Sequence, residues 1–193
     1  ETISIDNIED KIAKLLDDIQ ANIFKKAYDY REAHTTVVDS YEEFKEKIGD
    51  VTFVQDNESC SSYGVIRGMH FQRPPFEQAK LVRVVKGAVI DIVIDLRKES
   101  PTYLKIWSVY LSEENKRQFF VPRGFAHGFI SLKDNTIFQY KCDNFYNKES
   151  EDAILWCDET LPIYWTQYVN IEDIKVSDKD KLNKPFNEID NPF

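Results

Sequence analysis

Three short polar stretches of this sequence, residues 64–80, 121–129 and 140–146, contain side chains that could transfer protons or bind anions. A histidine can accept a proton near neutral pH, and a tyrosine can donate one to a developing enolate. Arginine and lysine can stabilise an enolate or hold phosphate oxygens. Together such groups would suit removal of a proton from a carbon next to a ketone. In chain order they are Arg67, His70, Lys80, His127, Tyr140 and Tyr146.

These side chains need a scaffold, and most of the sequence predicts a β-rich one. Apolar residues, many of them β-branched, alternate or run continuously over residues 81–96, 106–111 and 136–140. Turn residues such as Lys86-Gly87 separate the runs. Many short strands at fairly regular spacing are typical of a sandwich or barrel of the jelly-roll type. We therefore predict a mainly β fold with a ligand site at the mouth of its barrel.

The N-terminal part follows a different pattern. From Ile8 to Tyr30 the apolar positions recur with the 3.6-residue period of an amphipathic helix. Thr35–Val38 has the composition of a short strand, and Ser40–Ile48 that of a second short helix closed by Gly49. The sequence therefore divides into two parts, a helical N-terminal appendage over residues 1–50 and a β domain with a polar C-terminal tail over residues 51–193.

Composition excludes several classes of protein. The formal net charge of −9 argues against nucleic-acid binding, because there is no excess of cations to contact phosphates, although a few cations in a cleft could still bind an anion. The three cysteines are widely spaced and form no CxxC pair, so neither a disulfide framework nor a zinc site is expected. No apolar stretch has membrane-spanning length and the acidic start is not a secretory signal, so we expect a cytoplasmic protein without a membrane segment.

Six motifs of the β domain resemble the family of dTDP-4-dehydrorhamnose 3,5-epimerases, in the family's order and at its spacing. Any one motif would be weak evidence, whereas six in register identify the chain as a member from about residue 51 to about residue 180. The motifs are Thr52–Asn57 (TFVQDN), Arg67–Gln72 (RGMHFQ), Lys80–Arg83 (KLVR), Asp95–Arg97 (DLR), Ser100–Thr102 (SPT) and Gly124–Phe129 (GFAHGF).

The resemblance implies a cupin-like jelly roll (a double-stranded β-helix) that forms a homodimer and needs no metal or organic cofactor. It implies a dTDP-linked 4-keto-6-deoxyhexose as substrate, inverted at C3 and C5 through enol intermediates on the way to dTDP-L-rhamnose. In this pattern His70 is the base and Asp180 the carboxylate that orients it. Tyr140 is the acid on the opposite face of the sugar, and Lys80 stabilises the enolate oxygen.

The same resemblance assigns residues to substrate binding. Arg67 matches a diphosphate ligand. Gln55, Asn57 and Tyr146 match positions that contact the nucleotide or its phosphates. Asp91 and His127 match buried polar positions that line the site.

Alternative functions remain open at this stage. A metal-dependent cupin would need several converging imidazoles, often two histidines one residue apart, and this chain has only His34, His70 and His127. A noncatalytic sugar-nucleotide-binding module would be expected to lack His70 or Tyr140, and both are present. A related epimerase that inverts a single carbon of another 4-keto sugar nucleotide is the third alternative.

The N-terminal segment does not show the start expected of the family. Family members begin with strands that carry an Asp-x-Arg-Gly-x-Phe stretch, which residues 1–50 lack. Residues 17–27 and 38–45 resemble instead the C-terminal region of prolyl-tRNA synthetases, without that enzyme's catalytic motifs. We therefore expect a fusion joined near residues 43–50. The absence of the usual strands would favour a catalytically impaired sugar-nucleotide-binding protein as a further alternative.

Overall fold

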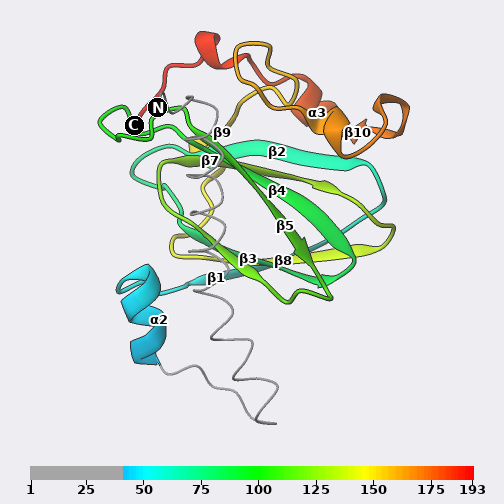
Figure 1. Cartoon of the computed structure of the whole chain (residues 1–193). Coiled ribbons are helices and arrows are strands. Elements are labelled where there is room, and N and C mark those ends of the chain that lie inside the picture. The colour runs from blue at the N-terminus through cyan, green and yellow to red at the C-terminus, as the bar shows by residue number, and fades with distance from the viewer. Residues whose placement is uncertain (1–40) are drawn as a thin grey trace, which may run out of the picture. The chain divides into compact units, whose positions relative to one another are not determined.

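The computed structural model describes residues 41–193, with side chains from residue 45 onward (Figure 1). The chain divides into two compact units, Glu1–Val51 and Thr52–Phe193. The predicted helix over residues 8–30 and the predicted strand over residues 35–38 lie outside the described residues. No helix in the described part is long and apolar enough to cross a membrane.

The first unit contains one described helix, α2 (Tyr41–Ile48). The sequence predicts this helix from Ser40, and the observed end at Ile48 agrees with that prediction. Gly49 ends it with a left-handed backbone (φ +84°), and its amide donates to the carbonyl of Lys45 at 2.9 Å. Glycine is the residue that adopts this conformation at a helix C-terminus with least strain.

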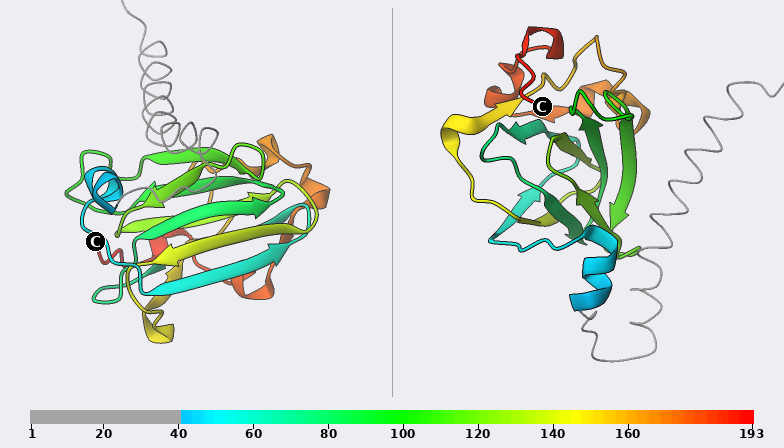
Figure 2. Two further views of the ribbon diagram at one scale, coloured as in Figure 1. Left: turned by 90° about the horizontal axis from the view of Figure 1, so that it is seen from below. Right: turned by 90° about the vertical axis from the view of Figure 1, so that its left-hand side faces the viewer.

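The second unit consists mainly of two β-sheets (Figures 1 and 2). One has the strand order β1-β8-β3-β6, and the larger has the order β10-β2-β7-β4-β5, with β9 added beside β2. All pairs are antiparallel except β10 with β2. The strands are β1 (Gln55–Ser61), β2 (Val65–Gln72), β3 (Lys80–Lys86), β4 (Ala88–Asp95), β5 (Ile106–Ser112), β6 (Gln118–Val121), β7 (Phe125–Ser131), β8 (Thr136–Cys142), β9 (Glu151–Ala153) and β10 (Lys175–Val176).

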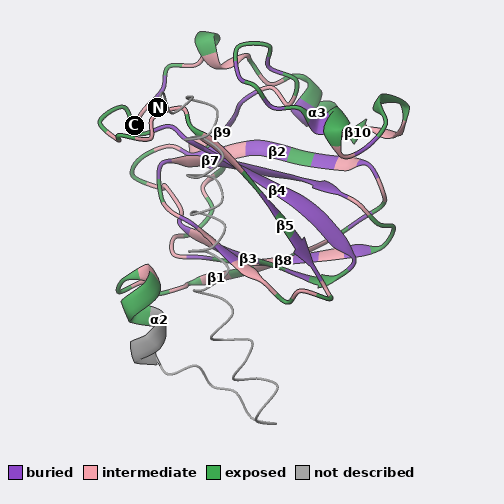
Figure 3. Ribbon diagram, viewed as in Figure 1, coloured by how far each residue is buried: buried purple, intermediate pink, exposed green. Residues whose placement is uncertain are grey.

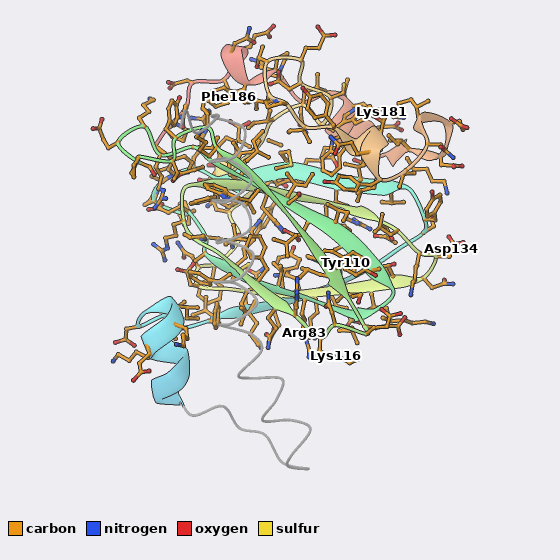
Figure 4. The ribbon with its side chains drawn as sticks, in the orientation of Figure 1. Arg83, Tyr110, Lys116, Asp134, Lys181 and Phe186 are labelled. Atoms are coloured by element: carbon orange, nitrogen blue, oxygen red, sulfur yellow. The ribbon has the colours of Figure 1, made fainter. Side chains whose placement is uncertain are left out.

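The C-terminal segments form a third layer that covers the outer face of the larger sheet. Figure 1 shows them along β2, on the side away from the four-stranded sheet. In Figure 4, Lys181 and Phe186 mark this layer, whereas Arg83 lies on β3 of the opposite sheet. The layer contains one short α-helix and three 3-10 turns: α3 (Asp178–Lys181), η2 (Trp165–Gln167), η3 (Ile171–Asp173) and η4 (Phe186–Glu188). A further 3-10 turn, η1 (Lys148–Ser150), directly precedes β9.

Two apolar cores, one on each face of the larger sheet, explain the sequence of β4. Val89 and Val93 pack between the sheets, in a cluster that includes Phe138 of β8. The alternate residues Ile90 and Ile92 pack outward, against the C-terminal layer. All eight residues of β4 are therefore buried (Figure 3). A strand covered on both faces is apolar almost throughout, which is the pattern that predicts it in the sequence.

A bulge in β2 brings this strand very close to β7. The pairing register between the two strands shifts between Arg67 and His70. Gly68 within the bulge has a φ of +139°, and a Cβ added to it would lie 2.5 Å from the Cα of Gly128. Any larger residue at position 68 would push the strands apart. The two glycines of the RGMHFQ and GFAHGF motifs therefore allow His70 to pair directly with His127.

A buried carboxylate holds the turn that follows β4. Asp95 is fully buried and accepts hydrogen bonds from the backbone amide, Nε and Nη2 of Arg97, and from the hydroxyls of Ser100 and Thr102. The guanidinium of Arg97 lies 4.8 Å from the ring centre of Phe125, the first residue of β7. The DLR and SPT motifs thus fix the start of the strand that carries His127.

We expect Asp95→Asn to lower the free energy of unfolding by about 2 kcal/mol at pH 7, because charge-assisted hydrogen bonds would be lost at a buried site. Burial opposes ionisation of Asp95, but the hydrogen bonds outweigh it and hold its pKa well below the usual range. Its contribution is therefore complete above about pH 4 and is lost as the pH falls below that value.

Urea denaturation of the wild type and the variant from pH 7 to pH 2 tests this prediction. The difference in stability should shrink on acidification. Asp178→Asn is the matched control, because the Asp178 side chain is almost fully exposed and should change stability little at any pH. An equal, pH-independent loss in both variants would contradict the role given to Asp95.

Candidate active site

His70 lies on β2 and faces a carboxylate of the C-terminal layer. Its Nε2 is 3.0 Å from Oδ1 of Asp180, a buried residue of α3. Ser177 caps this helix, since its hydroxyl accepts from the amide of Asp180 at 3.0 Å. β10 pairs with β2 just before the cap and so ties the tail to the barrel. The polar tail therefore folds back over the barrel, as required for Asp180 to orient His70.

The contact with Asp180 determines which nitrogen of His70 can act as a base. Burial opposes ionisation of Asp180, but its interaction with His70 outweighs burial and lowers the pKa of the carboxyl. An ionised carboxylate can only accept, so the 3.0 Å contact favours the tautomer with the hydrogen on Nε2, in which Nδ1 of the neutral ring keeps the lone pair. Nδ1 is buried and has no hydrogen-bond partner among the described residues. It is the atom free to take a proton.

A second histidine–carboxylate pair lies beside the first on the larger sheet. Nε2 of His127 on β7 lies 3.0 and 2.9 Å from the two carboxylate oxygens of Asp91 on β4. Both residues are buried, and burial raises the pKa of Asp91 although His127 opposes this. The His127 ring stacks on Phe138 of the opposite sheet, with ring centres 6.2 Å apart. This pair therefore forms part of the inner wall between the sheets.

The four-stranded sheet contributes the tyrosine and the lysine. Tyr140 on β8 and Lys80 on β3 share the inner face, and the Lys80 Nζ lies 5.8 Å from the centre of the Tyr140 ring. Burial lowers the pKa of Lys80, an effect that Asp91 and Glu151 oppose. Burial also raises the pKa of Tyr140, which keeps its hydroxyl protonated near neutral pH. The hydroxyl of Tyr140 has no hydrogen-bond partner within residues 41–193, so it is free to donate.

The amides of β1 join the same inner face through a chain of hydrogen bonds. Gln55 Nε2 donates to Asn57 Oδ1 at 2.9 Å, and Gln55 Oε1 accepts from the Tyr146 amide at 2.9 Å. Asn57 Nδ2 donates to the sulfur of Cys142 at 3.7 Å. The half-exposed Tyr146 in turn donates from its hydroxyl to Glu151 Oε2 at 2.8 Å. The predicted nucleotide-binding residues are thus connected to one another.

Arg67 is held at the edge of this group, next to β1. Its Nε donates to the Ser61 hydroxyl at 3.1 Å and its Nη2 to the Cys60 carbonyl at 3.4 Å. The Arg67 side chain is exposed. Burial raises the pKa of Tyr140, and the positive charge of Arg67 partly offsets this rise. An exposed guanidinium beside a protonated phenol is well suited to bind an anionic group that enters the site.

The structure adds residues that the sequence did not single out. Glu151 on β9 lies 4.0 Å from Nδ1 of His70 and accepts from Lys179 of α3. Cys142 lies opposite Lys80 on the inner face, and burial raises its pKa to about 11, although Lys80 opposes this. Glu151 lies in a polar stretch that looks like a solvated loop, and Cys142 is an isolated cysteine. Neither carries a sequence signal for this role.

The described residues contain no group of three His, Cys, Asp or Glu side chains placed to hold a metal ion. What the site does contain is a histidine on one sheet with a carboxylate of α3 beside it, and a protonated tyrosine with a partly buried lysine on the other sheet. Fold and site together define a two-sheeted β protein that carries acid–base groups on the inner faces of its sheets.

Comparisons with known proteins agree with this description. The sequence profile of the family described as dTDP-4-dehydrorhamnose 3,5-epimerase matches residues 17–188. The dTDP-4-dehydrorhamnose 3,5-epimerase of Methanothermobacter thermautotrophicus is 48% identical over 145 residues, which cover 75% of this chain and 77% of the relative. The chain therefore belongs to the dTDP-4-dehydrorhamnose 3,5-epimerase family.

Solved structures of the family have the same fold. The enzyme from Elizabethkingia anophelis superposes with a TM-score of 0.73 at 48% identity, covering 78% of this chain and 81% of that one. The RmlC protein from Legionella pneumophila, solved in complex with dTDP-4-keto-L-rhamnose, gives a TM-score of 0.73 at 42% identity and covers 80% of each chain. The prediction of a mainly β, cupin-like jelly roll is confirmed.

The family match begins at residue 17, inside the segment predicted to be an appendage. The division of the chain into compact units falls between Val51 and Thr52, next to the predicted boundary. The resemblance of residues 1–50 to prolyl-tRNA synthetases lies outside both findings and stays a prediction.

Proposed function

We propose that this chain epimerises a dTDP-linked 4-keto-6-deoxyhexose at C3 and C5, a step in the synthesis of dTDP-L-rhamnose. The observation that carries the proposal is the free Nδ1 of His70, with the free hydroxyl of Tyr140 on the facing sheet. Inversion at carbon needs a base on one side of the ring and an acid on the other. Family membership and the ligand named for the Legionella structure support the same substrate.

The mechanism uses the acidity of carbons next to a ketone. His70 takes the proton from C3 or C5, and the electron pair moves into the ketone to form an enolate. The ammonium of Lys80, a partly buried residue, stabilises the enolate oxygen. Tyr140 then donates its proton to the same carbon from the opposite face, and exchange with solvent restores both residues. A second round inverts the other carbon.

The remaining site residues bind and orient the substrate in this proposal. Arg67 holds the diphosphate, while Gln55, Asn57 and Tyr146 contact the nucleotide or its phosphates. His127 and Asp91 line the inner wall beside the sugar, where their hydrogen-bonded pair fixes the position of the imidazole. The homodimer implied by the family resemblance and the cytoplasmic location expected from the sequence belong to this proposal and stay predictions.

Incubation with dTDP-4-keto-6-deoxyglucose in D2O tests the function directly. We expect NMR to show deuterium entering at both C3 and C5. Each carbon loses its proton to His70 and receives a deuteron from Tyr140, whose hydroxyl exchanges with the solvent. Entry at one carbon alone would indicate a single-centre epimerase. No entry, from protein shown to be folded, would contradict the proposal and favour a catalytically impaired binding protein.

A further inference from the structure

Glu151 occupies a position beside the base. It is the first residue of β9, and it pairs with Gln72 of β2 while Ala153 pairs with His70. Residues two apart on a strand point to the same face, so Glu151 shares the face of His70. Its Oε1 lies 4.0 Å from Nδ1 of His70, the nitrogen that faces away from Asp180. The imidazole therefore lies between two carboxylates.

Hydrogen bonds keep Glu151 in place and charged. Its Oε2 accepts from the hydroxyl of Tyr146 and from Nζ of Lys179. Burial opposes ionisation, but these hydrogen bonds outweigh it and lower the pKa of Glu151. The carboxylate is thus negative at neutral pH, and its second oxygen is left facing the imidazole.

The charges around His70 do not cancel. Asp180 and Lys179 approach His70 from α3, and Glu151 approaches it from β9. The neighbouring residue on β7 is His127, whose imidazole is paired with the carboxylate of Asp91. Lys179 neutralises part of the charge on Glu151, but it contacts the oxygen that faces away from the ring. From the opposite sheet, Lys80 and Tyr140 interact electrostatically with Glu151. Protonation of Nδ1 would place a hydrogen toward Glu151.

We propose that Glu151 is a positioning residue for the base, which stabilises the imidazolium that His70 becomes once it has taken the substrate proton. The proposal rests on the proposed function for its catalytic meaning, but its electrostatic part concerns His70 alone. Asp180 orients the neutral ring through Nε2, and Glu151 receives the charge that arrives at Nδ1. The hydrogen bond from Tyr146 links this carboxylate to the residues proposed to bind the nucleotide.

The test compares Glu151→Gln with the wild type by following the His70 imidazole resonance against pH, without substrate. The His70→Ala variant identifies the resonance. Glutamine keeps an oxygen for Tyr146 and Lys179 but carries no charge, so the titration midpoint of His70 should lie at lower pH in the variant than in the wild type. The acid limb of the pH profile for deuterium exchange should move in the same direction, with a maximal rate lower by about tenfold.

Glu149→Gln is the matched control. It removes the same charge two residues earlier, from an exposed side chain without a hydrogen bond or ion pair to any described residue. Its His70 titration should equal that of the wild type. An unchanged midpoint in Glu151→Gln, or a rise in KM alone with an unchanged pH profile, would overturn the proposal. Absence of exchange in the wild type would instead count against the proposed function, because the titration is measured independently.

Discussion

Replacing His70 with alanine should lower the rate of deuterium entry at both C3 and C5 by about 10²- to 10⁴-fold, the range expected when a general base is removed. The same nitrogen is proposed to abstract both protons, so neither carbon should be spared. Deuterium entry followed by NMR in D2O measures the loss at each carbon separately. Loss at one carbon only would mean that a second group acts as base for the other.

Two further measurements separate loss of the base from loss of the fold. His70→Ala leaves the buried carboxylate of Asp180 without its partner, which is destabilising, so circular dichroism must show that the variant is folded. Added imidazole should then restore part of the exchange, because it can occupy the space left by the side chain. A folded variant that exchanges at the wild-type rate would exclude His70 as the base.

Tyr140→Phe should separate proton exchange from inversion. His70 can still remove the proton and return a deuteron to the same face, so exchange should persist. Without the phenol no group donates from the other face, and formation of inverted product should fall by about 100-fold. NMR of the product reports exchange and configuration in one experiment.

Tyr110→Phe provides the matched control for this change. Tyr110 is an exposed residue of β5 (Figure 4), and its hydroxyl has no hydrogen-bond partner among the side chains and backbone of residues 45–193. Its removal should leave both exchange and inversion at the wild-type level. Inversion of both centres at the wild-type rate by Tyr140→Phe would show that another donor acts on that face.

The strands that could be predicted are those with an apolar signal. Residues 81–96 form β3 and β4, residues 106–111 lie in β5, and residues 136–140 lie in β8. β1 was not predicted as a strand, because its sequence, QDNESCS, is polar throughout. This strand forms one edge of its sheet and turns polar residues toward the site, so burial of apolar side chains does not govern its composition.

The site was only partly predictable for a related reason. Arg67, His70, Lys80, His127 and Tyr140 lie in dense motifs, and their residue types alone indicate acid–base and anion-binding chemistry. Asp180 could be assigned through the family resemblance only, since it lies in a polar tail distant in sequence from the barrel. Glu151 could not be assigned, because nothing in its local sequence distinguishes it from a solvated carboxylate.

The sequence by itself determined the β character of this protein, its family and the residue types that could carry the reaction, because alternation and motif spacing are local properties. The tertiary structure decided which of those groups meet. The close approach of Gly68 and Gly128 sets the pairing of His70 with His127. The apolar outer face of the larger sheet holds the C-terminal layer, and with it Asp180, against the barrel. Contacts between residues distant in the chain depend on packing, which no local pattern encodes.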